Sequence, residues 1–86
     1  MAYVLETDVF VKETKLVDVS VEEYISIKIK RLRKSKNYSQ GDLANKLKIN
    51  RSSISNIEKG KQNLTLQNLE AICKIFECKS SDILPF

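Results

Sequence analysis

The chain has 86 residues, of which 42% are apolar and 30% charged, and its formal net charge is +4. That length allows one small core, and the balance of residue types is globular, which excludes collagen, extended disorder and a second independent domain. No unbroken apolar run approaches the roughly 20 residues that a bilayer requires, and acidic residues near the start argue against a signal peptide. We therefore expect a cytoplasmic protein with no membrane contact.

Histidine is absent, and the only cysteines are Cys73 and Cys78, without a CxxC pair. This composition removes the usual Cys/His zinc sites and the histidine-dependent nucleophilic mechanisms. The chain also lacks a glycine-rich phosphate loop and a plausible pair of catalytic carboxylates. We expect two free, buried thiols, no enzyme activity, no metal site and no cofactor.

Residues 1–19 form an N-terminal extension with a net charge of −2, whereas residues 20–86 carry +6. Strand-forming residues concentrate between Asp8 and Val19, and Glu13 with Thr14 is a possible turn. The extension is either a β-hairpin or a disordered tail. Because an isolated hairpin is marginal in water, paired strands would need the helical domain or a second chain as a partner. The acidic charge favours contact with protein over contact with DNA.

A helix is expected from Ser20 to about Ser35. Ser20 and Glu23 match a capping box, and Val19 with Tyr24 matches a hydrophobic staple. Its apolar residues follow helical spacing. The helix contains a basic run, which suits either a polyanion or a solvated face: Lys28, Lys30, Arg31, Arg33, Lys34 and Lys36.

Two short helices follow. Ser39 and Asp42 repeat the capping pattern, and the second helix ends near Leu47. After Lys48–Asn50 comes a third helix, in which Ile54 and Ile57 face inward and which Gly60 ends.

Thr65 caps a fourth helix, and a last short helical turn at residues 80–84 precedes Pro85. The buried stripe expected on the fourth helix consists of Leu66, Leu69, Ile72, Cys73 and Phe76. The fold class is thus all-α, with five helices in residues 20–86 and an extended or β-hairpin arm before them.

Two short helices joined by a tight turn are the helix-turn-helix arrangement, whose second helix enters the major groove of DNA. The third helix suits that role because its outward side chains are small or basic, and because the helix contains no acidic residue before Glu58. These outward side chains are Arg51, Ser52, Ser55 and Asn56.

The segment SQGDLANKLKINRSSISNIEKGKQNLTLQNLEAI resembles the Cro/C1-type (XRE-like) helix-turn-helix family of phage repressors and bacterial regulators. The resemblance covers about residues 22–84, and Asn63–Thr65 is similar to the controller proteins of restriction-modification systems. The resemblance implies a five-helix domain of the lambda-repressor type. Lys48 and Glu77 depart from the family pattern because glycine is common at both places.

The resemblance also implies site residues. Arg51, Ser52, Ser55 and Asn56 would read bases, and Arg33 would form a structural ion pair with Glu58. Contacts to DNA phosphates would come from Arg33, Ser39, Gln40, Ser53, Lys59, Lys61 and Asn63.

These roles describe a repressor-type regulator that binds double-stranded DNA at a palindromic operator as a homodimer, in a bacterial or phage nucleoid. The dimer contact is expected around Phe76, Ile83, Leu84 and Phe86 or at the N-terminal strands. The alternative is an antitoxin-like or other protein-interaction module, which would bind DNA for autoregulation and a protein partner through residues 1–19.

Overall fold

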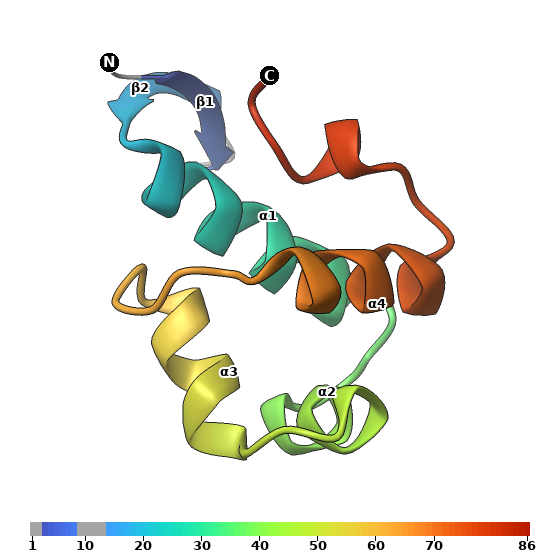
Figure 1. Ribbon diagram of the computed structural model, residues 1–86. Coiled ribbons are helices and arrows are strands. Elements are labelled where there is room, and N and C mark those ends of the chain that lie inside the picture. The colour runs from blue at the N-terminus through green and yellow to red at the C-terminus, as the bar shows by residue number, and fades with distance from the viewer. Residues whose placement is uncertain (1–2, 9–13) are drawn as a thin grey trace.

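The computed structural model describes residues 3–8 and 14–86 (Figure 1). A two-stranded antiparallel sheet of β1 (Tyr3–Asp8) and β2 (Thr14–Val19) comes first. Four α-helices and one 3₁₀ turn follow: α1 (Val21–Ser35), α2 (Gln40–Leu47), α3 (Arg51–Glu58), α4 (Leu66–Phe76) and η1 (Ser80–Asp82). Figure 1 shows the sheet beside the start of α1, at the opposite end of the molecule from α2 and α3.

Of the two alternatives for residues 1–19, the structure contains the hairpin, whose first strand lies earlier in the chain than expected. The strands pair from Tyr3 opposite Val19 to Asp8 opposite Thr14. Thr14 therefore begins β2 and is not a turn residue, because its backbone pairs with β1. The other residues expected in the first strand and the turn, 9–13, lie outside the described residues.

The hairpin is attached to α1 through one face. Side chains alternate across a strand, so Leu5 and Val19 share a face, and both are buried. The Tyr3 ring meets the Tyr24 ring of α1 edge-on, with 6.4 Å between ring centroids. Val4, on the other face, is 57% exposed. The sheet therefore has the apolar support that an isolated hairpin lacks.

Ser20 caps α1 as expected, with its Oγ accepting the Glu23 amide proton at 3.1 Å. The second hydrogen bond of the predicted capping box, from the Ser20 amide to the Glu23 side chain, is wrong. The Glu23 carboxylate accepts from the Ser20 hydroxyl at 3.3 Å instead of from the Ser20 amide, because the hydroxyl proton is the donor it meets in this geometry.

One core holds the helices together. Ile29 of α1, Leu43 of α2, Ile54 of α3 and Ile72 of α4 are fully buried and form its centre. Burial of each such side chain stabilises the fold by roughly 1.5 to 3 kcal/mol. The core therefore fixes the relative positions of α2 and α3, on which the candidate interface is built.

The prediction of five helices is wrong, because residues 80–84 form only the 3₁₀ turn η1 and no further α-helix. The stretch between Lys79 and Pro85 is too short for a ladder of helical hydrogen bonds, and proline has no backbone N–H. The Lys79 amide instead donates to the Asp82 carboxylate at 2.9 Å. This turn still places Ile83 in the core, where it is fully buried.

Two predictions of burial, on α4 and just after it, also need correction. Leu66 is 82% exposed, since as the first helical residue it precedes the part of α4 that packs on the core, whose buried residues are Leu69, Ile72 and Phe76. Cys73 and Cys78 are free thiols, but half-buried. Burial and the neighbouring Cys73 raise the pKa of the Cys78 thiol to about 11.

Among the described helices, none combines the length and the apolar character needed to cross a bilayer.

Candidate nucleic-acid interface

The junction of α2 and α3 is built by local signals in the sequence. Ser39 and Asp42 form a complete capping box at the start of α2, with both hydrogen bonds at 2.9 Å. These hydrogen bonds lower the pKa of the Asp42 carboxyl below its ordinary value. At the other end, Lys48 ends α2 with a φ of 59°, in the left-handed region. The following residues, Ile49 and Asn50, lead directly into α3 at Arg51.

A shallow hollow of about 440 Å³ lies between the start of α2 and the exposed face of α3. Its lining side chains are Gln40, Arg51, Ser52 and Ser55. Every one of them carries hydrogen-bonding groups, and none is acidic. The hollow therefore joins three residues predicted to read bases with one predicted to contact a phosphate.

The other predicted contact residues lie outside this lining. Asn56 is half-buried on α3, and its carbonyl accepts the Lys61 amide proton at 2.9 Å. Ser53 is half-buried near the start of α3, whereas Lys59, the C-cap residue of α3, and the following Lys61 and Asn63 are exposed. Asn63 also borders a second, much smaller hollow of about 20 Å³ between α1 and the segment after α3.

The start of α3 carries neither a negative charge nor a side-chain cap. Its first turn holds no acidic residue, and Asn50, its N-cap residue, makes no side-chain capping hydrogen bond. The caps of the other three α-helices, Ser20, Ser39 and Thr65, all accept a backbone proton. A helix start is the positive end of the helix dipole, so this one favours an approaching anion.

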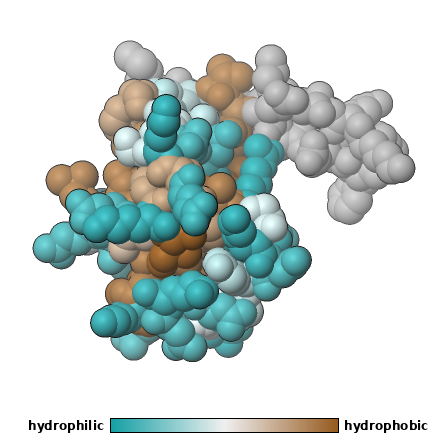
Figure 2. Space-filling model, turned by 90° about the vertical axis from the view of Figure 1, so that its right-hand side faces the viewer, coloured by the Kyte–Doolittle hydropathy of each residue, from teal (hydrophilic) through white to brown (hydrophobic). Residues whose placement is uncertain are grey.

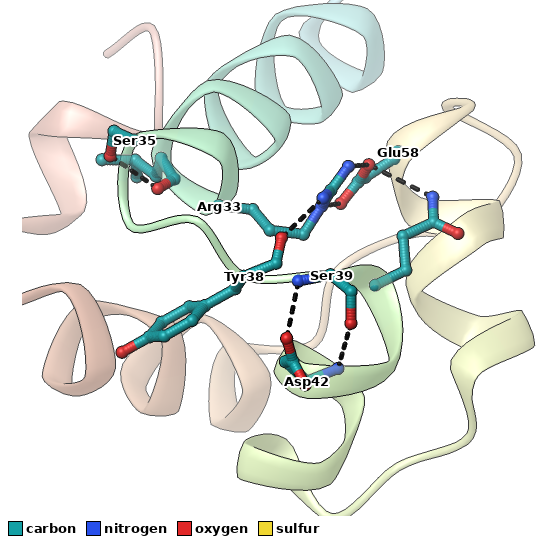
Figure 3. A network of polar contacts seen from close by, with 8 residues as sticks. Arg33, Ser35, Tyr38, Ser39, Asp42 and Glu58 are labelled. Carbon is teal, nitrogen blue, oxygen red and sulfur yellow. Dashed lines mark hydrogen bonds and ion pairs between the residues drawn. The ribbon is translucent and has the colours of Figure 1, made fainter.

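Behind the hollow, Arg33 of α1 and Glu58 of α3 form an ion pair (Figure 3). Arg33 Nε donates to Glu58 Oε2 at 2.7 Å and Nη2 donates to Oε1 at 3.0 Å, while Nη1 donates to the Tyr38 carbonyl at 2.8 Å. The two side chains are 10% and 3% exposed. Hydrogen bonding to Glu58 raises the Arg33 pKa, so this arginine stays charged. All three nitrogens of Arg33 are thus used inside the protein.

Two members of this network have no counterpart in the sequence predictions. The Tyr38 carbonyl is a main-chain acceptor, a group that every residue carries, so no residue pattern identifies it. Gln40 Nε2 donates to Glu58 Oε1 at 3.3 Å across a separation of 18 residues. The sequence motifs contain Gln40 and Glu58 but do not indicate that the two side chains meet.

Comparison with known proteins agrees with this architecture. A family model described as helix-turn-helix matches residues 29–83. The chain belongs to this helix-turn-helix family. The match begins within α1 and includes α2, α3, α4 and η1, so the Cro/C1-type resemblance of the sequence is confirmed. Members of this class are DNA-binding transcription regulators.

Relatives within the helix-turn-helix family include proteins named for restriction-modification control. The control protein C.BamHI of Bacillus amyloliquefaciens is 40% identical over 60 residues, which cover 69% of this chain and 74% of that protein. The wild-type restriction-modification controller protein C.Esp1396I is 39% identical, with a TM-score of 0.63 over 69% of this chain and 78% of its own. The controller protein C.AhdI from Aeromonas hydrophila shares the fold, with a TM-score of 0.69 at 22% identity over 73% of this chain and 96% of its own.

Proposed function

We propose that this helix-turn-helix protein is a sequence-specific transcriptional regulator of the repressor type, which binds a palindromic operator as a homodimer with α3 in the major groove. The observation that carries the proposal is the acid-free hollow lined by Gln40, Arg51, Ser52 and Ser55. A major groove admits a helix, and donors on that helix can reach base edges. The relatives C.BamHI and C.Esp1396I extend the proposal to a controller of a restriction-modification system.

Within this proposal the side chains have two roles. Arg51 would donate to a guanine, Asn56 would pair with an adenine, and Ser52 and Ser55 would make smaller base contacts. Phosphate contacts would fix the register of the protein on the duplex. We assign them to Ser39, Gln40, Ser53, Lys59, Lys61 and Asn63, and leave out Arg33 because its nitrogens are engaged with Glu58 and Tyr38.

A homodimer is proposed because one small domain reads few base pairs. Two half-sites about one helical turn apart, roughly 34 Å, give both affinity and palindromic symmetry. Figure 2 views the molecule from the side on which α4 and η1 lie, and apolar surface is visible there between hydrophilic side chains. Phe86 is 76% exposed and Leu84 half-buried, whereas Phe76 and Ile83 belong to the core. Of the four C-terminal residues expected at the dimer contact, Leu84 and Phe86 are thus available to a partner, and the N-terminal strands, where Val4 is exposed, stay the alternative contact.

Selection of bound sequences from random duplex DNA, at a stated salt concentration, tests this proposal. The expected outcome is a palindromic motif. Arg51→Ala should weaken binding by about 1 to 3 kcal/mol and relax the preference at one base pair in each half-site. Lys61→Ala, the matched control at a proposed phosphate contact, should weaken binding to all sequences alike. It should also lower the slope of log affinity against log salt concentration by about one. Binding that is sensitive to salt but indifferent to sequence would overturn specific regulation.

A protein-interaction module of the antitoxin type is the second candidate. The observation in its favour is the hairpin, which precedes the residues that match the family model and lies at the other end of the molecule from α2 and α3. A partner on this hairpin would leave the DNA-facing helices accessible. In that case DNA binding would serve autoregulation.

A further inference from the structure

The side-chain amide of Gln40 meets a carboxylate that is already paired. Glu58 Oε1 accepts from Arg33 Nη2 at 3.0 Å and from Gln40 Nε2 at 3.3 Å. The Glu58 side chain is only 3% exposed, so water has little access to compete for these donors. Glu58 therefore connects α1 and the start of α2 to the end of α3.

The chemistry of the carboxylate determines which way the amide of Gln40 faces. An ionised carboxylate only accepts hydrogen bonds, so the Gln40 nitrogen must face Glu58 and the Gln40 oxygen must point elsewhere. The Gln40 side chain also lines the hollow with Arg51 and Ser52. Among the residues that the structure describes, its amide oxygen and second N–H have no further partner, so they are available to a ligand in that hollow.

We propose that Glu58 is a positioning residue for DNA recognition that acts through Gln40. This inference rests on the proposed function. By holding the Gln40 amide in one orientation before DNA arrives, Glu58 removes rotamer freedom that binding would otherwise have to restrict. The buried position of Glu58 and its ion pair with Arg33 also keep its negative charge from repelling the phosphates.

A double-mutant cycle separates this role from a purely structural one. Affinity for the selected duplex is measured for the unaltered protein, Glu58→Gln, Gln40→Ala and the double variant, at a temperature where circular dichroism shows all four folded. Glu58→Gln should weaken binding roughly three- to tenfold when Gln40 is present, as expected for one hydrogen bond. In the Gln40→Ala background the same substitution should change affinity little, because the group it positions is gone.

Equal losses in both backgrounds would overturn the inference while leaving the proposed function intact. Failure of the unaltered protein to bind any duplex would overturn both. Glu70→Gln on α4 is the matched control, because Glu70 is 74% exposed and pairs only with Lys74 at 3.4 Å among the described residues. This change should leave affinity unaltered.

A measurement without DNA tests the contact itself. In an NMR spectrum of the free protein, the Gln40 side-chain amide should show one proton shifted by hydrogen bonding, and Glu58→Gln should move that resonance. Glu70→Gln should not. A Gln40 amide resonance that is the same in the unaltered protein and in Glu58→Gln would overturn the positioning role.

Discussion

Lys48 adopts a left-handed backbone conformation at the end of α2, with a φ of 59°. Asn37 and Glu77 also have positive φ values. Asparagine tolerates this region better than lysine or glutamate, because its short polar side chain can hydrogen-bond locally. The turn between α2 and α3 is therefore formed at a cost in backbone energy that glycine would avoid.

Replacing Lys48 with glycine should raise the free energy of unfolding by about 0.5 to 1 kcal/mol, since relief of the left-handed strain exceeds the entropy lost by glycine. Thermal melting monitored by circular dichroism measures this change. Lys30→Gly, at an exposed position inside α1, is the control and should lower stability by about 1 kcal/mol. A lower melting temperature for Lys48→Gly would contradict the argument.

The ion pair between Arg33 and Glu58 connects two helices, α1 and α3. Removing one partner from a buried pair leaves the other charge unpaired. Glu58→Ala should therefore destabilise the fold by about 3 to 5 kcal/mol in a urea titration. Glu70→Ala, which breaks an exposed pair on α4, should cost less than about 1 kcal/mol. Similar midpoints for the two variants would refute a structural role for the buried pair.

Sequence reasoning predicted the elements well where their signals are local. Ser20, Ser39 and Thr65 are N-caps, as expected, and a cap requires only residues within one helical turn. Leu66 was misplaced because burial depends on where α4 meets the core, which spacing within one helix does not determine. The fifth helix failed for a similar reason, because a 3₁₀ turn suffices to bury Ile83.

The candidate site was predictable in composition but not in geometry. The family pattern indicated Gln40 and Arg51 individually, and the structure shows that they line one hollow. The hydrogen bond from Gln40 to Glu58 spans two helices, so it depends on how α2 packs against α3. Arg33 illustrates the limit: its residue type suits a phosphate, yet its surroundings direct it to Glu58 and Tyr38.

On the scale of the whole molecule, the hairpin lies at the opposite end from α2 and α3, the helices proposed to contact DNA (Figure 1). Leu5 and Val19 attach the hairpin to α1, on which the core residue Ile29 also lies. The hairpin is thus placed to affect partner choice and stability more than base recognition.

Deletion of residues 1–19 should leave affinity for the selected duplex unchanged. It should also lower the free energy of unfolding by roughly 1 to 3 kcal/mol, because lost burial at Leu5 and Val19 is partly offset by the released entropy of the strands. Fluorescence anisotropy and thermal melting measure the two effects. If a protein partner bound to the unaltered chain is lost on deletion, the second candidate function is supported. Lost duplex binding by a folded, truncated chain would show that the two ends are not independent.

The separation of Arg33 from Glu58 has a consequence for synthesis in the cell. The two residues are 25 positions apart, so Arg33 leaves the ribosome well before its partner. At about 5 to 20 residues per second, the arginine waits roughly 1 to 5 seconds. During that interval the hairpin and α1 can form, since their pairing is local, but α1 has an unpaired cation on its inner face. Packing of α1 into the core, whose centre also includes Ile72 of α4, is therefore completed only after both α3 and α4 emerge.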